Sequence, residues 1–231
     1  MTEAPVLPAD DQGIFEFARK HLFSAVIGDV MDTIGLRQQF LPQTIQPLSS
    51  EMVIVGRAMP VTEKLLPPDW EETGSHEPFG LMFRALDDLK PGEIYMCSGT
   101  GGDFAVWGEM MSVRAQTLGA AGAIVDGYSR DTPGILSLGF PVFSQGRYAQ
   151  DQGVRGYISD FRQPISYSNG AVLTPGDLVF ADLDGVVMVP RAAEREVLHL
   201  AVQKVFGENT VRKAILGGMS TEEAFRTYGI M

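Results

Sequence analysis

The segment GTGGDFAVWGEMMSVRAQTLGAAGAIVDGYSRD, from Gly99 to Asp131, holds the strongest local pattern in the chain. It opens with a glycine-rich loop, after which the apolar spacing favours a helix from about Phe104 to Leu118. The short apolar run from Ala123 to Asp126 predicts a buried strand, and Arg130 and Asp131 follow it in a loop. Ligands of α/β folds bind beyond the carboxyl ends of strands. The segment therefore predicts an α/β fold with its site at the Arg130–Asp131 pair.

Arg130 and Asp131 suit the binding of a small anion together with a metal ion. An arginine binds a carboxylate through two parallel hydrogen bonds, and an aspartate is a hard oxygen ligand for Mg²⁺. Glu109 lies near the start of the predicted helix, where the helix dipole favours an acidic side chain. The alternative is that Arg130 and Asp131 are ordinary loop residues, the glycine-rich loop is only a turn and Glu109 is a plain helix-start acid.

Outward from this segment, strand and helix patterns mix along the whole chain. Strands are expected at Met52–Thr62, Glu93–Cys97, near Val142, near Tyr157, at Leu178–Ala181 and at Val186–Val189. Helices are expected from Gln12 to about Leu22, after a Ser24 cap, at Leu81–Leu86, from Ala192 to about Leu216 and from a Ser220 capping box to about Tyr228. This mixture predicts one domain over residues 12–231, with C-terminal helices, after a flexible arm at residues 1–11.

Composition and charge exclude several classes of protein. The net charge is −11 with no basic run, which argues against a nucleic-acid binder. No stretch reaches the roughly 18 uninterrupted apolar residues of a membrane span, and the first eleven residues lack a signal-peptide pattern. Cys97 is the single cysteine, so no internal disulfide forms, as is typical of a reducing compartment. We therefore expect a cytoplasmic protein with neither nucleic acid nor a membrane as its partner.

Other kinds of site fit the sequence less well. The glycine-rich loop lacks the Rossmann and P-loop spacings, and the three histidines are scattered without zinc-ligand spacing. Cys97 ends an apolar strand and is expected to be buried and inert. Asp29 and Asp32 share one face of a predicted helix, which is either a solvated face or a metal site.

The run GGDFAVWGEMMSVRAQTLGAAGAIVDGYSRDT, from Gly101 to Thr132, resembles the core signature of the RraA-like family. That family includes the class II 4-hydroxy-4-methyl-2-oxoglutarate / 4-carboxy-4-hydroxy-2-oxoadipate aldolases and the regulator of ribonuclease E activity. IVGRAMPV (Ile54 to Val61), PGDLVFADLDGVVMVP (Pro175 to Pro190) and the terminal YGIM also agree. The resemblance implies a swivelling β/β/α-type domain with central sheets flanked by helices. It also implies homotrimers or homohexamers with active sites at the subunit interfaces.

The resemblance also implies a metal centre. By analogy with the aldolase members, Asp131 binds Mg²⁺ or Mn²⁺ directly and Arg130 contacts the substrate. Glu109 orients metal-bound water, and Glu208 of a neighbouring subunit completes the shell, also through water. The regulator members do not retain the metal aspartate, so Asp131 favours an enzyme.

The same resemblance implies that the backbone at Gly108, Met110 and Met111 binds the substrate carboxylate. One departure is Gly134, because many aldolase members have an acid at that position. The expected function is a divalent-metal-dependent lyase that cleaves a C–C bond of a short 2-oxo acid to give pyruvate and also decarboxylates oxaloacetate. The alternatives are a non-catalytic regulator that binds an RNA-processing enzyme, or a metal-dependent lyase or hydratase acting on another sugar-derived acid.

Overall fold

The long strand β2 (Ile54–Leu65) organises the fold in the computed structural model, which describes residues 6–67, 69–70, 79–99 and 102–230. Its first eight residues are all buried, as expected for a central strand covered on both faces. β2 pairs in parallel with β3 (Glu93–Ser98). Its first half also pairs antiparallel with β12 (Leu178–Asp182), and its second half pairs antiparallel with β9 (Gly156–Phe161).

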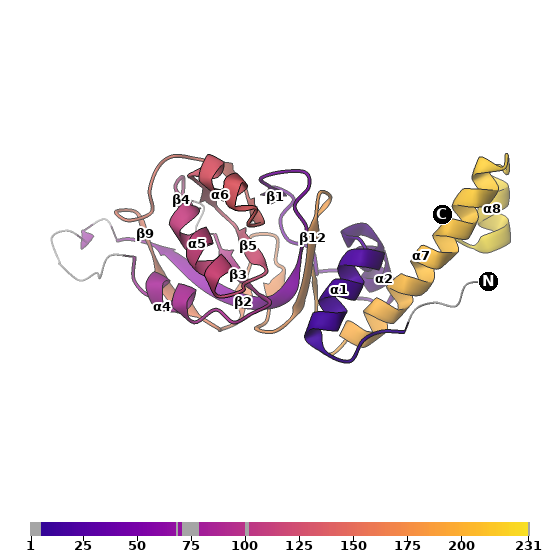
Figure 1. Ribbon diagram of the computed structural model, residues 1–231, viewed down its shortest axis with the longest axis horizontal. Coiled ribbons are helices and arrows are strands. Elements are labelled where there is room, and N and C mark those ends of the chain that lie inside the picture. Colours follow the sequence, from indigo (N-terminus) through magenta and orange to yellow (C-terminus); the bar gives the residue numbers. More distant parts are fainter. Residues whose placement is uncertain (1–5, 68, 71–78, 100–101, 231) are drawn as a thin grey trace.

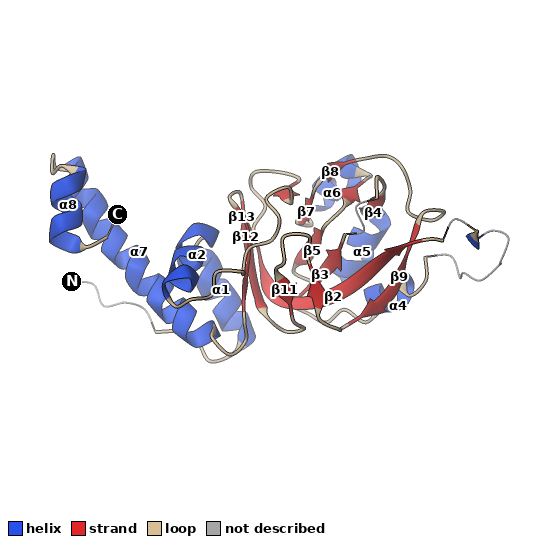
Figure 2. Cartoon of the chain, turned by 180° about the vertical axis from the view of Figure 1, so that it is seen from behind, coloured by secondary structure: helices blue, strands red, loops and turns tan. Residues whose placement is uncertain are grey.

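The central sheet has eight strands in the order β1-β7-β5-β3-β2-β12-β13, and β9 branches off β2 (Figure 2). Its remaining strands are β1 (Gln46–Pro47), β5 (Gly122–Val125), β7 (Val142–Ser144) and β13 (Gly185–Val189). A small parallel sheet contains β4 (Ala105–Trp107), β6 (Tyr128–Ser129) and β8 (Gly146–Arg147). A two-stranded sheet joins β10 (Ile165–Ser166) and β11 (Val172–Leu173).

The helices of the described residues form two groups, one over a face of the sheet and one beyond β12 (Figure 1). The first group packs near β3, β4 and β5 and contains α4 (Met82–Asp87), α5 (Glu109–Thr117) and α6 (Thr132–Leu138). The second group packs beside β12 and contains α1 (Asp11–His21), α2 (Ser24–Thr33), α7 (Glu194–Leu216) and α8 (Thr221–Tyr228). Among the helices of the described residues, none combines the length and apolarity needed to cross a membrane. The predicted α/β fold with C-terminal helices is confirmed.

The predicted helix from Phe104 to Leu118 is wrong in its first part. Ala105–Trp107 form β4, and the helix starts only at Glu109, after Gly108. The four residues from Phe104 to Trp107 are all buried, which suits a short strand inside the core rather than one face of a helix. The glycine-rich loop therefore leads into a strand, and not into a helix N-terminus.

Three other boundaries also differ from the prediction. The arm predicted at residues 1–11 ends earlier, because the Asp10 side chain caps α1 and Asp11 is its first residue. Ser24 does not cap α2, since its backbone N–H and its hydroxyl both donate to the Asp182 carboxylate, at 2.8 and 2.5 Å. The loop expected after Asp131 instead forms the helix α6, with proline in its first turn. Ser220 does cap α8, where its hydroxyl accepts the Glu223 N–H.

Candidate functional site

Arg130 and Asp131 follow β6, and the small parallel sheet carries them to the start of α5. The backbone N–H of Arg130 donates to the Trp107 carbonyl at 2.9 Å, which extends the β4–β6 pairing by one residue. Trp107 is the last residue of β4, and Gly108 and Glu109 follow it directly. The pair is thereby placed against the N-terminus of α5, which begins five residues later than predicted.

Asp131 adopts a backbone conformation that is rare for an aspartate. Its φ is +58°, in the left-handed region, and it is the N-cap residue of α6. An N-cap aspartate usually accepts a backbone N–H of its own helix, but the Asp131 carboxylate makes no such bond. Strained residues of this kind cost about 1–3 kcal/mol and cluster at functional sites. Here the strain leaves the carboxylate free of its helix and turned toward Arg130.

The Asp131 carboxylate is only loosely engaged. Its Oδ2 atom lies 3.7 Å from Arg130 Nε and 3.4 Å from the backbone N of Glu109. Both distances exceed the 2.7–3.2 Å of ordinary N–H···O hydrogen bonds. The side chain is 48% exposed, so its oxygens keep lone pairs for another ligand.

Gly108 allows this approach of Asp131 to α5. A Cβ atom at position 108 would lie 2.9 Å from Asp131 Oδ2, closer than real Cβ contacts allow. The first-turn amides of α5, at Glu109, Met110 and Met111, have no carbonyl partner within the helix. These amides and the helix dipole favour an anion at this point. The predicted carboxylate contacts at Gly108, Met110 and Met111 remain a prediction, but the backbone there is suitably placed.

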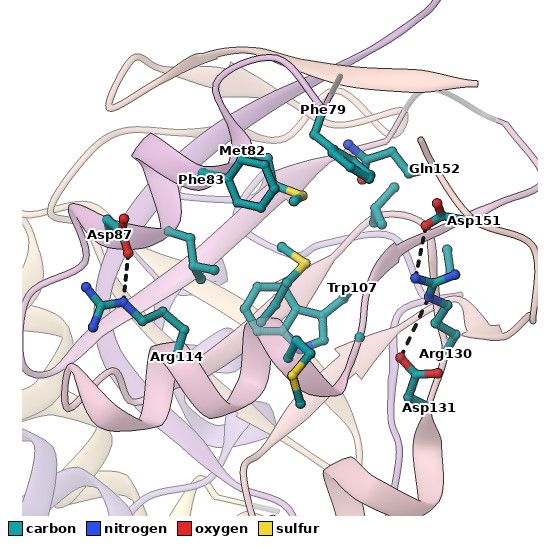
Figure 3. A pocket seen from close by; sticks show the side chains of 16 residues that line it. Phe79, Met82, Phe83, Asp87, Trp107, Arg114, Arg130, Asp131, Asp151 and Gln152 are labelled. Carbon is teal, nitrogen blue, oxygen red and sulfur yellow. Dashed lines mark hydrogen bonds and ion pairs between the residues drawn. The ribbon is translucent and has the colours of Figure 1, made fainter. Parts of the chain in front are cut away.

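Asp151 is a further acid at this point that the sequence analysis missed. Its Oδ1 atom lies 3.2 Å from Arg130 Nη2, on the opposite side of the guanidinium from Asp131 (Figure 3). Asp151 reaches the site because it forms an isolated parallel bridge with Ala105. No local pattern in the sequence signals a bridge between residues so far apart.

A cavity of about 380 Å³ opens beside the three charged residues. Arg130, Asp131 and Asp151 form one end, and Gly108, Met110 and Met111 contribute to its lining. Trp107 lies in the middle of the cavity wall (Figure 3). A second hollow of about 300 Å³ lies on the other side of the pair and is lined by Arg147 and Tyr148 as well. A volume of this order suits a small-molecule ligand.

Glu109 was predicted near the start of the helix and is the first residue of α5, but its side chain lies on α6. A Cβ atom at Gly134 would be only 2.2 Å from the Glu109 carboxyl carbon. The Glu109 carboxylate therefore sits directly over the Cα atom of Gly134. The departure from the aldolase pattern at Gly134 thus has a local consequence, because an acid at that position could not coexist with Glu109 in this place.

Glu208 is not near Asp131 within one chain. It lies on α7, at the opposite end of the molecule from α5 and α6 (Figure 1). Lys204 Nζ lies 3.6 Å from the Glu208 carboxylate and 2.8 Å from that of Asp29. The contribution of Glu208 from a neighbouring subunit remains a prediction. Asp29 forms this ion pair, and Asp32 is exposed, so both belong to a solvated helix face.

Asp131 is the candidate metal ligand that the sequence analysis named. Within the described ranges, no three or more His, Cys, Asp and Glu side chains gather closely enough to hold a metal ion. His76 lies outside those ranges. One open carboxylate suits Mg²⁺, which usually keeps several waters and binds one or two carboxylates together with oxygens of the substrate. The donor set at Asp131 therefore fits Mg²⁺ or Mn²⁺ and not a structural zinc.

Two buried titratable groups lie in the core behind the cavity. Glu63 is 4% exposed, and neither carboxylate oxygen has a hydrogen-bond partner among the described residues. Burial raises the pKa of Glu63 to about 8, so the side chain is mostly uncharged at neutral pH. Burial also raises the pKa of the Cys97 thiol well above its usual range. Cys97 is buried as predicted, and its thiol is unreactive because the reactive thiolate is suppressed.

Most of the chain matches a known protein family. Residues 24–188 match the family described as RraA-like, Aldolase/RraA. The protein DlpA of Legionella pneumophila is 31% identical over 206 residues, which are 89% of this chain but only 32% of DlpA. This chain therefore spans about a third of that relative.

A second relative matches over most of its own length. A protein of Halalkalibacterium halodurans named "Putative 4-hydroxy-4-methyl-2-oxoglutarate aldolase" is 30% identical over 86% of this chain and 87% of its own. Among solved structures, an uncharacterized protein from Pseudomonas syringae pv. tomato is 26% identical. It superposes with a TM-score of 0.79 over 94% of this chain and 98% of its own.

Proposed function

This chain belongs to the RraA-like family, and we propose that it is a divalent-metal-dependent lyase that cleaves a C–C bond of a short 2-oxo acid to give pyruvate. One observation carries the proposal. The Asp131 carboxylate is held in a strained conformation, loosely engaged, beside Arg130 and the free amides of α5 at one end of a cavity. The relative named as an aldolase supports this choice of reaction.

Asp131 is the residue that would hold the cation. When bound, a divalent ion supplies Lewis-acid stabilisation of the negative charge that develops on the 2-oxo oxygen. The amides of Met110 and Met111 bind the substrate carboxylate, since they point out of a helix N-terminus. Arg130 stabilises the enolate oxygen, and it lies between Asp131 and Asp151. Oxaloacetate would lose CO₂ by the same route, because both reactions leave the enolate of pyruvate.

We assign removal of the C4 hydroxyl proton to one of two acids. Asp151 lines the cavity directly. Glu109 does not line it, so it would act through water, as the resemblance implies. A homotrimer or homohexamer would allow Glu208 of a neighbouring subunit to approach the site, and the projecting position of α7 and α8 supports such an assembly (Figure 1).

Substitution of Asp131 tests the proposal. Asparagine tolerates left-handed backbone almost as well as aspartate, so Asp131→Asn removes the charge and keeps the loop. We expect pyruvate release from oxaloacetate in the presence of Mg²⁺ to fall at least about 100-fold, because the charge that holds the cation is gone. A coupled lactate dehydrogenase assay measures the rate with Mg²⁺ and with EDTA.

Asp184→Asn is the matched control, since Asp184 is an exposed residue in the turn between β12 and β13. Its rate should be unchanged. Full activity of Asp131→Asn would overturn the proposal. Activity of the unaltered chain that persists in EDTA would also contradict it. The regulator alternative predicts no pyruvate release and binding of an RNA-processing enzyme that EDTA leaves intact.

A further inference from the structure

The cavity beside Arg130 and Asp131 has two chemically different ends. The charged end contains Arg130, Asp131 and Asp151 (Figure 3). Beyond it the wall is formed by large apolar side chains: Phe79, Met82, Phe83, Leu86, Trp107 and Met111. A ligand anchored by its carboxylate at the charged end would place its other end against this wall.

The positive charge at the far end of the apolar wall already has a carboxylate beside it. Arg114 is the cation that lines the far end, and its Nε atom donates to Asp87 Oδ1 at 2.7 Å. Figure 3 shows this pair on the other side of Trp107 from Arg130. Because Asp87 lines the cavity with Arg114, a second carboxylate of a ligand would compete with Asp87 for the remaining Arg114 donors and would be repelled by its negative charge.

Most of the wall has no hydrogen-bond donor for a distal carboxylate, and besides Arg114 the Gln152 side chain lines the cavity with an unpartnered amide Nε2. A carboxylate that leaves water for an apolar surface loses its hydration and gains nothing in return. An aliphatic or aromatic group gains from the same transfer, and aromatic rings prefer tilted or offset contacts with Phe and Trp side chains. The flexible thioethers of Met82 and Met111 adapt to groups of different shape.

Two large apolar side chains of the wall are exposed within one chain. Phe83 is 57% exposed and Met110 is 70% exposed, and both line the cavity. Trp107, which lines the same cavity, is 1% exposed and belongs to the core. Large apolar side chains grouped at the mouth of a cavity mark a binding surface. A ligand group bound at the mouth would cover Phe83 and Met110 while the rest of the ligand reaches the charged end.

We propose that this wall binds an apolar substituent at C4 of the substrate, so that the preferred substrates are 2-oxo acids with an aliphatic or aromatic tail. The inference rests on the proposed function. For a 4-hydroxy-2-oxo acid, the C4 hydroxyl proton goes to a base and the C3–C4 bond breaks. Its electron pair forms the enolate of pyruvate, which takes a proton at C3, and the tail leaves on an aldehyde. The step needs no oxidant or reductant.

Binding of two matched 2-oxo acids tests the proposal independently of turnover. 2-Oxo-4-phenylbutanoate and 2-oxoglutarate share the 2-oxo acid and carry a phenyl group or a carboxylate at the far end. Titration calorimetry with Mg²⁺ present should give a Kd at least about 10-fold lower for the phenyl compound, the scale on which an apolar pocket discriminates. Equal or tighter binding of 2-oxoglutarate overturns the inference, and so does the absence of binding by both.

Phe83→Arg sharpens the same test. It adds a guanidinium to the wall at a side chain that is already exposed, so the core is not disturbed. The preference should shift at least about 10-fold toward 2-oxoglutarate, through a charge-assisted hydrogen bond. Phe225→Arg on α8 is the matched control, since Phe225 is 58% exposed and does not line the cavity. An unchanged preference in Phe83→Arg, or an equal shift in both variants, contradicts the proposal.

A parallel assay of pyruvate release separates this inference from the proposed function. 4-Hydroxy-2-oxo-4-phenylbutanoate should be cleaved with a kcat/KM at least about 10-fold above that of 4-hydroxy-2-oxoglutarate. If the phenyl ligand binds more tightly but neither hydroxy acid releases pyruvate, the apolar pocket stands and the lyase is refuted. If 4-hydroxy-2-oxoglutarate is the better substrate, the lyase stands and the pocket assignment is overturned.

Discussion

Arg57 and Arg130 each lie beside two carboxylates, yet their surroundings are opposite. The Arg57 side chain is 9% exposed, and its guanidinium is hydrogen bonded to both Asp11 and Glu194, which joins β2 to α1 and α7. Arg130 is 38% exposed at a cavity and makes one contact of 3.2 Å and one of 3.7 Å. A guanidinium whose donors are filled holds elements together. One with donors to spare beside a cavity is available to a ligand.

Replacing each arginine with alanine should give the largest difference in stability between the two sites. Arg57→Ala leaves the buried Glu194 without its partner, and we expect the free energy of unfolding to fall by about 3–5 kcal/mol. Arg130→Ala removes only exposed ion pairs, which are worth about 0–1 kcal/mol. Urea unfolding of both variants measures the difference.

Pyruvate release should be affected in the reverse order, with the larger loss in Arg130→Ala. Arg130→Ala should lower pyruvate release at least about 100-fold, because it removes a stabilising charge from the reacting oxygen. The folded fraction of Arg57→Ala should keep its rate, when assayed well below the unfolding transition. Equal losses of stability in the two variants would remove the distinction between a structural and a functional arginine.

Glu63 extends the comparison to buried acids. Glu194 and Glu63 are both 4% exposed, but Glu194 is bound by Arg57 while no described residue hydrogen bonds to the Glu63 carboxylate. The pKa of Glu63 is raised to about 8 in the folded chain, from an ordinary value of 4.5. Between these values the folded chain retains a proton that the unfolded chain has lost. Glu63 therefore makes stability fall as pH rises, by up to about 1.4 kcal/mol per pH unit.

Glu63→Gln should remove this dependence, because glutamine is uncharged at every pH. Urea unfolding of the variant and the unaltered chain at pH 5.5, 6.5 and 7.5 gives the two slopes. The variant should lose less stability across this window, and above about pH 8 the two slopes should become parallel. Identical slopes at all three pH values would show that Glu63 is ionised inside the folded chain.

The sequence predicted the part of the site that depends on neighbours along the chain. AIVD is followed by Arg130 and Asp131 in one local segment, so the strand and the pair after it were recognisable from a short apolar run and its length. The helix α6 was missed, because Pro133 and Gly134 are also typical of turns. β4 was missed because a strand of three residues is too short to show a period.

The remaining parts of the site depend on contacts that no local pattern encodes. Asp151 is brought to Arg130 by its bridge to Ala105, which is a product of tertiary structure. Phe79, Phe83 and Trp107 come from separate segments and form one wall only after folding. The left-handed conformation of Asp131 was also beyond prediction, since aspartate adopts it only where the surrounding structure imposes it.

The smallest expected effect concerns Glu109, which the structure places beside the Arg130–Asp131 pair and over Gly134. In Gly134→Ala the added Cβ atom would lie 2.2 Å from the Glu109 carboxyl carbon, so this side chain must rotate away from α6. Because the end of a glutamate moves easily, we expect the unfolding free energy to change by less than about 1 kcal/mol. If Glu109 orients water, kcat should fall about 10-fold, as it should in Glu109→Gln.

A double-mutant cycle tests whether the two effects have one origin. The variant with both Gly134→Ala and Glu109→Gln should be no slower than Glu109→Gln alone, because a displaced carboxylate and an absent one are equivalent losses. Gly217→Ala at the end of α7 is the control, since Gly217 has no positive φ and a Cβ there meets no atom closer than 3.3 Å. If the losses of kcat in the two single variants multiply in the double variant, Gly134→Ala lowers kcat by a route other than displacement of Glu109. An unchanged kcat in Glu109→Gln would leave Asp151 as the acid that takes the proton. Arg130 and the two carboxylates beside it, Asp131 and Asp151, would then suffice for the cleavage without Glu109.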